Sequence, residues 1–555
     1  MEQTLFQAPN SQLLRNWRHP VRFLSSTITG WRVAAFFVSL ITLVPLLVVL
    51  FSLFSPEPAI WQHLRTYVLP DLLLNTLWLV LGVGLLTGFL GVSLAWLTAV
   101  CEFPGRRFFA WALMLPLAMP AYVAAFVNIG FFDFTGPLQT IIRAWLGSSA
   151  WFPPIRSRGG VILIMSFALY PYVYLLARNA FLTQGRRSLE VAQSLGLSRR
   201  AGFFKVALPM ARPWIMGGIM LALMEALADF GTVAVFNYDT FTTAIYKAWF
   251  GLFSLAAASQ LASLLVLLVL GMVMLEQAWR GAKRYTATGK SSLTRFQLGP
   301  QLAWAACAFA SLVLIFAFGL PLVQLVVWCV GVFAEDFDAR YPLFVLHSVL
   351  LSAMAACLVV VAALILAYSL RLYRDWPTRF FGRLSTLGYA IPGTVLAVGV
   401  FIPIAWLDNQ LIHWFGAWIG NGAILRGTLT VMLLAYVARF LAPGFNAIDS
   451  AMQRITRSQE EAAKGMGLVG WRLFLRVHLP MLRGGILGAA LLVFVDVMKE
   501  MPITLMTRPF GWDSLSVRVF ELTSEGQWER AALPAIAIVA AGLIPVLFLT
   551  RHSEK

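Results

Sequence analysis

Two pairs of carboxylates interrupt long apolar segments of this chain, where ionisable side chains are rare. Glu225 and Asp229 form one pair, and Asp496 and Glu500 form the other. The four-residue spacing predicts that both carboxylates of a pair share one helix face. Acids in a membrane segment often mark the path of a polar solute, and four carboxylates around one path would favour a cation. A structural role stays open, because Asp496 can pair with Lys499 and acids near the end of a span can lie in water.

A second pattern occurs in two polar segments that are 271 residues apart. In both copies a glycine follows a glutamate by six positions, and a proline follows it by nineteen. The candidate positions are Glu190, Ala192, Gly196 and Pro209 in the first copy, and Glu461, Ala462, Ala463, Gly467 and Pro480 in the second. Residues 186–195 and 457–466 are each predicted to form a short helix. Glycine adopts left-handed dihedrals easily, so it suits the corner before a second short helix. The proline then ends that helix or opens the next one.

A structural interpretation of these glutamates also exists. The run from Ser458 to Glu461 could be a capping box, which would make Glu461 a helix-start signal. The corresponding start in the first copy is Arg187, which cannot cap, yet Glu190 is retained there. Capping therefore does not account for both copies, although it can coexist with another role.

The composition is that of a helical membrane protein. Of 555 residues, 59% are hydrophobic and only 12% are charged, about half the charged share of a soluble protein. Apolar blocks of roughly 20 residues or more are long enough to cross a bilayer as helices. Twelve spans are predicted, near residues 33–54, 71–100, 107–130, 160–179, 213–235, 252–276, 302–331, 344–370, 380–406, 425–442, 484–504 and 531–550.

The repeat predicts two tandem units of six spans each, in parallel orientation. The polar loops lie at about 180–211 in the first unit and 443–483 in the second. The predicted order is an N-terminal segment (1–32), the first unit (33–279), a linker (280–300), the second unit (301–550) and a short tail (551–555).

The net charge of +17 reflects membrane topology. Lys and Arg concentrate in alternate loops, whereas the opposite loops carry acids such as Glu335 and Asp336. This distribution places the basic loops and both termini in the cytoplasm. The basic excess therefore indicates contact with a lipid bilayer and no nucleic-acid partner.

No catalytic constellation is present in the sequence. The four cysteines have no paired spacing, and the six histidines form no zinc-binding helix motif. The chain is therefore expected to be no enzyme, and to carry no catalytic residues and no assigned metal site.

The repeated glutamate–glycine–proline loop resembles the EAA loop of type I binding-protein-dependent ABC importer permeases. The second copy matches fully, and the first has Val191 where that family usually has alanine. The resemblance implies that both loops dock on ATPase subunits, two copies per complex. It also implies a periplasmic solute-binding protein, location in the bacterial inner membrane, and ATP used by the partner, with no cofactor bound by this chain.

Two stretches resemble a narrower branch, the fused iron(III) permeases. They are residues 228–232 with 239–246, and residues 499–504 with 508–510. This likeness implies that ferric iron is handed over by the binding protein. Thiamine, polyamine or an oxyanion remain alternative solutes within the same class. A secondary transporter of twelve spans would fit the span count but would not explain the repeated loop. A membrane enzyme or assembly factor is disfavoured, because the sequence shows no clustered His, Cys or acidic site on one face of the membrane.

Overall fold

The computed structural model describes residues 30–55, 58–149, 151–185, 194, 196–280, 295–338, 340–373, 375–419 and 424–553. Over these ranges the chain is helical apart from turns and one pair of two-residue parallel strands, β1 (Cys101–Glu102) and β2 (Phe296–Gln297). Eleven helical segments in the described part are long and apolar enough to cross a membrane, and Ala532–Val546 is a shorter one. The predicted all-α polytopic fold is therefore confirmed.

The first half contains most of the shorter helices. Its α-helices are α2 (Gly30–Phe51), α3 (Pro58–His63), α4 (Leu69–Val100), α5 (Arg106–Ala112), α6 (Ala121–Phe132), α7 (Pro137–Leu146), α8 (Arg158–Ala180), α10 (Arg199–Gly202), α11 (Leu208–Ala228), α12 (Gly231–Val235), α13 (Phe241–Tyr246) and α14 (Leu255–Arg280). Single 3-10 or π turns adjoin them at η2 (Ser52–Phe54), η3 (Leu64–Val68), η4 (Leu115–Ala118), η5 (Phe181–Gly185), η6 (Phe203–Ala207) and η7 (Lys247–Gly251).

The second half follows the same order. Its α-helices are α15 (Pro300–Leu314), α16 (Leu320–Asp336), α17 (Tyr341–Leu372), α18 (Trp376–Thr386), α19 (Gly393–Ile419), α20 (Leu429–Gln453), α21 (Arg457–Gly465), α22 (Gly470–Leu473), α23 (Leu479–Lys499), α24 (Pro502–Thr507), α25 (Leu515–Ser524) and α26 (Ala532–Ser553). The adjoining turns are η8 (Ile315–Gly319), η9 (Leu387–Ala390) and η10 (Phe474–His478).

The third and ninth predicted spans are not continuous helices. Each is broken by a 3-10 turn, η4 or η9, just before Pro120 or Pro392. Proline lacks a backbone N–H and disfavours helical dihedrals at the residue before it, so a break at these positions is expected. At the second break, Gly388 packs so tightly on α20 that an added Cβ would lie 1.9 Å from the carbonyl oxygen of Ala438.

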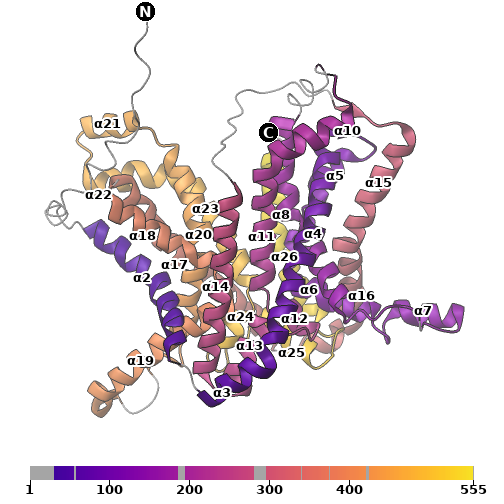
Figure 1. The fold of residues 1–555 in the computed structure, drawn as a ribbon. Coiled ribbons are helices and arrows are strands. Elements are labelled where there is room, and N and C mark those ends of the chain that lie inside the picture. Colours follow the sequence, from indigo (N-terminus) through magenta and orange to yellow (C-terminus); the bar gives the residue numbers. More distant parts are fainter. Residues whose placement is uncertain are drawn as a thin grey trace, which may run out of the picture.

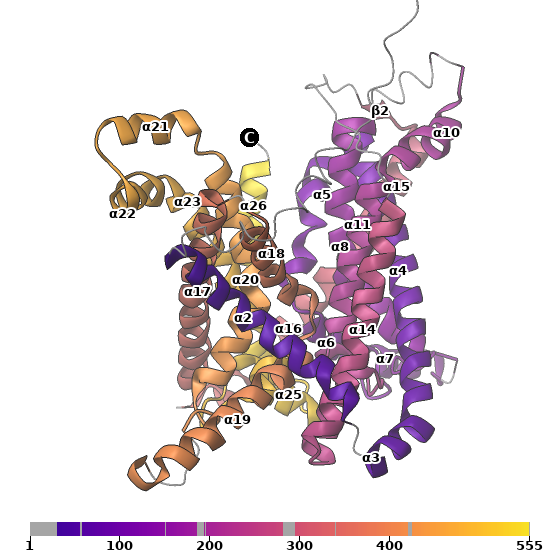
Figure 2. The same cartoon turned by 60° about the vertical axis from the view of Figure 1, so that its left-hand side comes forward.

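The first span of each half packs against the other half. Helix α2 contacts α17, α18 and α19, while α15 and α16 contact α5 and α6. Figure 2 shows α2 lying across the helices of the second half. Trp31 of α2 stacks on Trp471 of α22 with a centroid distance of 5.8 Å. The two sequence units are therefore interlocked.

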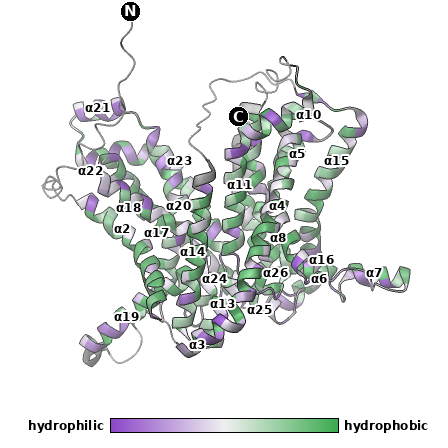
Figure 3. Cartoon of the chain, viewed as in Figure 1, coloured by the Kyte–Doolittle hydropathy of each residue, from purple (hydrophilic) through white to green (hydrophobic). Residues whose placement is uncertain are grey.

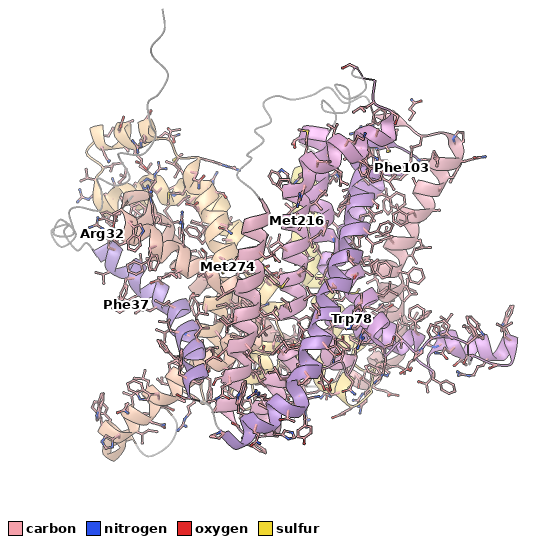
Figure 4. All side chains as sticks on the ribbon, in the orientation of Figure 1. Arg32, Phe37, Trp78, Phe103, Met216 and Met274 are labelled. Atoms are coloured by element: carbon pink, nitrogen blue, oxygen red, sulfur yellow. The ribbon has the colours of Figure 1, made fainter. Side chains whose placement is uncertain are left out.

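Hydrophobic residues run along most of the long helices (Figure 3), and many of them are exposed at the outside of the bundle. Phe37 and Trp78, labelled in Figure 4, are 61% and 46% exposed. Such exposure would be unfavourable in water, but in a bilayer these side chains meet lipid. The exposed apolar surface along α2, α4 and α17 is therefore the lipid-facing belt.

A partly buried ion cluster holds helix α21 of the second polar loop against the spans. Glu460 accepts hydrogen bonds from Arg371 Nε at 3.0 Å and lies 3.0 Å from His478 Nε2. Arg371 also donates to the carbonyl oxygen of Ile455 at 2.6 Å. Partial burial raises the pKa of Glu460, but the hydrogen bonds from His478 and Arg371 outweigh it and leave the pKa below its ordinary value. The ionised form of Glu460 is therefore the form that anchors α21.

We expect Glu460→Gln to loosen α21. Charge-assisted hydrogen bonds contribute about 2 kcal/mol each, so amide exchange over 457–465 should accelerate roughly 10- to 100-fold. Acidification should act in the same direction. The contribution of a carboxylate with a lowered pKa is complete above its unfolded pKa and is lost as the pH falls through the folded one. Glu461→Gln is the matched control, since its exposed side chain lies outside the cluster. Equal exchange rates in both variants would contradict the anchor.

We expect Gly388→Ala to destabilise the protein by about 1–3 kcal/mol, because the new methyl group overlaps a backbone carbonyl that cannot move away easily. The measurement is the melting temperature in detergent or nanodiscs. Gly488→Ala is the control, because nothing lies within 4 Å of the added Cβ there. An unchanged melting temperature for Gly388→Ala would show that η9 can shift away from α20.

Candidate functional site

The helices that carry the predicted acids end before the second acid of each pair. Helix α11 stops at Ala228, and Asp229 has an extended ψ of 127°. Helix α23 stops at Lys499, and Glu500 has an extended ψ of 124°. The prediction that both acids of a pair share one helix face is therefore wrong.

Hydrogen bonds to the backbone explain these breaks. Asp229 Oδ1 accepts the N–H of Thr232 at 2.7 Å, at the start of α12. Glu500 Oε2 accepts the N–H of Ile503 at 2.9 Å, at the start of α24. A carboxylate that satisfies the first N–H groups of the next helix favours a new start over continuation of the old helix. Both acids thus have a structural role as helix caps.

All four acids nevertheless line one cavity of about 170 Å³ between the two halves. Other polar side chains on its wall come from α6, α8, η9, α20 and α23. They are Tyr122, Tyr172, Tyr389, Arg439 and Lys499. The structure thus brings together the four acids that the sequence singled out and Lys499, the expected partner of Asp496. It adds three phenols and Arg439, which sequence reasoning missed.

The two acids that lie on helices also have partners. Glu225 of the first half accepts a hydrogen bond from the Tyr389 hydroxyl of the second half at 3.0 Å. Asp496 pairs with Lys499 at 3.2 Å, the contact expected in its structural interpretation. One of these contacts joins the halves, and the other stays within α23.

Three polar atoms on the cavity wall have no hydrogen-bond partner within the described ranges. They are Glu500 Oε1, the Tyr122 hydroxyl and Arg439 Nε. Arg439 is nine-tenths buried and donates through Nη1 to the carbonyl oxygen of Ile391 at 3.2 Å. Buried groups without partners are costly, so a polar solute that satisfied them would be stabilised. A basic residue inside the predicted span 425–442 was the sequence signal that could have revealed Arg439.

The acids do not converge on one point. In the part of the chain that the structure describes, no three His, Cys, Asp or Glu side chains stand close enough to hold one metal ion. The four carboxylates line the wall without forming such a cluster, so they offer separate contacts and no common metal site.

The second polar loop forms a helical corner from α21 and α22, on the same side of the bundle as α10 (Figure 1). Gly467 has φ +81° and Gly196 has φ +82°, in agreement with the predicted glycine corners. Glu461 and Ala462 are exposed, whereas Ala463 is buried. The helix cap is Thr456, which forms a capping box with Gln459, so the predicted box starting at Ser458 is wrong.

The loop prolines open the following spans. Pro209 and Pro480 are the second residues of α11 and α23, and each follows a π turn. Of the first loop, Glu190 and Ala192 lie outside the described residues, whereas Gly196 and Pro209 lie within them. Around the second loop, Met466, Val469 and Trp471 are more than half exposed. The loop that carries Glu461 therefore also exposes three apolar side chains.

Comparisons with known proteins agree with this architecture. Residues 359–555 match the family described as "Binding-protein-dependent transport system inner membrane component". The chain is 29% identical over 495 residues to an Fe(3+)-transport system permease protein of Haemophilus influenzae, covering 87% of this chain and 90% of the relative. It is 25% identical over 522 residues to a probable ABC transporter permease protein of Sinorhizobium fredii, covering 86% and 87%.

A sulfate transport system permease protein of Escherichia coli is 30% identical over 210 residues, which are 37% of this chain and 68% of the relative. The family match covers α18 to α26 and the second loop, and the long relatives extend the likeness over both halves. The chain therefore belongs to the inner membrane components of binding-protein-dependent transport systems, the permeases of ABC transporters.

Proposed function

We propose that this chain is the permease subunit of an ATP-driven importer that passes ferric iron across the inner membrane. The observation that carries the proposal is the cavity between the halves, where Glu225, Asp229, Asp496 and Glu500 meet three tyrosines. Hard cations prefer oxygen ligands, and the wall offers carboxylate and phenol oxygens. The Fe(3+)-transport relative, alike over most of both chains, supports the same solute.

An oxyanion is the second candidate solute. Sulfate permease relatives match part of the chain, and Arg439 and Lys499 supply positive charge on the cavity wall. Four acids outnumber these two cations, however, and an anion would meet repulsion from the excess. The charge balance therefore favours a cation. Thiamine and polyamines are the cationic alternatives if iron(III) is not transported.

The partners follow from the two loops. Each loop would dock on one copy of a separate ATPase, which uses the ATP, and a periplasmic binding protein would deliver the solute to the opposite face. Lys and Arg concentrate on the loop side, so that side and both termini are assigned to the cytoplasm.

The second loop is built to transmit movement. Glu461 and the patch of Met466, Val469 and Trp471 face outward, where an ATPase would bind. Behind them, Arg371 and His478 tie α21 to α17 and to the turn that leads into α23. ATPase closure would shift α23, which carries Asp496 and leads to Glu500. A ligand can bias such an equilibrium only through contacts that differ between the two states.

We expect Glu461→Lys to weaken ATPase binding, and Glu190→Lys with Glu461→Lys to weaken it further, because each reverses a charge in a docking loop. The measurement is co-purification of the ATPase, followed by its dissociation constant. Glu529→Lys is the control, since this exposed acid lies in the turn that follows α25, and Figure 1 shows α25 on the side of the bundle away from α21. Normal co-purification with the double variant would refute docking through these glutamates.

We expect the fourfold amide variant E225Q, D229N, D496N and E500Q to lose most iron uptake at equal expression, because the path would lose its negative charge. Uptake of radiolabelled iron(III), thiamine and putrescine is measured in proteoliposomes that contain the ATPase and the binding protein. The pair E225Q with D496N separates transport from helix capping, because these two acids cap no helix. Iron uptake at the wild-type rate in the fourfold variant would refute the role of the four acids in the pathway.

Uptake of another solute with ATP would keep the importer class and replace the substrate. Uptake that needs no ATPase would overturn the proposal as a whole, and would favour a secondary transporter.

A further inference from the structure

Two amphipathic segments leave the bundle sideways, on the side away from α10 and α21. Figures 1 and 2 show α19 projecting outward, and Figure 1 shows α7 projecting in the other direction. The ledge segments, as we term them, are α7 and residues 404–415 of α19. Each follows the broken third span of its half, so both halves place such a segment at the corresponding point of the repeat.

The polar side of α7 fixes it to the turn that precedes it. Gln139 donates to the carbonyl oxygen of Phe132 at 2.9 Å, and Arg143 donates to that of Phe134 at 2.8 Å. Gly136 is enclosed by this turn, since an added Cβ would lie 2.5 Å from the carbonyl oxygen of Phe131. The outward angle of α7 is therefore built into the fold.

A neighbouring side of α7 is apolar and open. Its apolar residues recur at the three- and four-residue spacing of one helix face, and they are Leu138, Ile141, Ile142, Trp145 and Leu146. Ile141, Trp145 and Leu146 are 56%, 86% and 67% exposed. No described part of the chain covers this stripe.

The ledge segment of α19 has the same design with different residues. Leu407, Leu411, Trp414 and Phe415 share one face, and Trp414 is 65% exposed. Asp408 is fully buried and accepts the N–H groups of Ile424 and Leu425, each at 2.9 Å. This contact joins the segment to the chain that returns toward α20.

We propose that both ledge segments lie in the headgroup region of the non-cytoplasmic leaflet, with their apolar faces toward the acyl chains. A protein partner would read a particular sequence, but the two stripes share only amphipathicity and exposed tryptophan, the features that a bilayer interface selects. Both segments also branch directly from the membrane-spanning bundle (Figure 1), so an apolar face on either would continue the lipid-facing surface.

The consequence is a pair of anchors at the level of the membrane surface, one on each half. Each is joined directly to a broken span that lines the central cavity. They would hold the depth and tilt of these spans while the loop side moves, and they would leave the face between them for the binding protein.

The test uses nitroxide labels on single cysteines in the assembled transporter in nanodiscs, after the four native cysteines are replaced by serine. Labels go on Trp145→Cys and Trp414→Cys. Leu85→Cys on α4, which is 76% exposed, reports the deep belt, and Thr140→Cys reports the polar side of α7. Ile141→Cys replaces Trp145→Cys if that variant does not fold.

We expect the ratio of oxygen to nickel-reagent accessibility at Trp145→Cys and Trp414→Cys to fall between those of Leu85→Cys and Thr140→Cys. A ratio equal to that of Thr140→Cys would overturn the proposal, because the segments would then lie in water. Shielding from both reagents that appears only with the binding protein would assign the stripes to that protein. Shielding that depends on two transporters per disc would assign them to a second copy.

Discussion

Helix breaks closed by carboxylates inside the membrane are the constraint on which the rest of the structure depends. A backbone N–H group without a partner is costly where water is excluded, so a chain can turn there only if other groups satisfy it. Asp229 and Glu500 accept the first N–H groups of α12 and α24. The turns bring both carboxylates to the cavity, one helical turn beyond Glu225 and Asp496. The same atoms thus stabilise the break and give the cavity its charge.

The two halves share a backbone plan but differ in the side chains that line the cavity and anchor the loops. At the repeat offset, Arg439 corresponds to Ala168, and both line the cavity. Glu460 and His478 correspond to Leu189 and Ala207, so the ion cluster that anchors α21 has no sequence equivalent in the first half. The exchange of first spans ties these unequal halves together, because α2 contacts both the spans of the second half and Trp471 within its polar loop. The second loop therefore contacts both halves, because its Trp471 stacks on Trp31 of α2.

The sequence by itself determined the solvent, the fold class, the repeat and the glycine corners. Apolar blocks of span length have few stable alternatives in a bilayer, and left-handed dihedrals at Gly196 and Gly467 are a local property of glycine. The sequence also selected the four acids, since a charge in an apolar block is visible without coordinates. The sequence did not determine which solute these acids contact.

Only the tertiary structure decided which groups meet. The early ends of α11 and α23 depend on competition between helix continuation and carboxylate caps, and spacing alone predicted one continuous face. Tyr389 reaches Glu225, and Arg371 reaches Glu460, across 164 and 89 residues of chain. The packing of α2 on the second half is equally invisible to periodicity, which reports the burial of a face but not its partner. Local chemistry is written in the sequence, whereas contacts between distant segments depend on the free energy of the whole packed bundle.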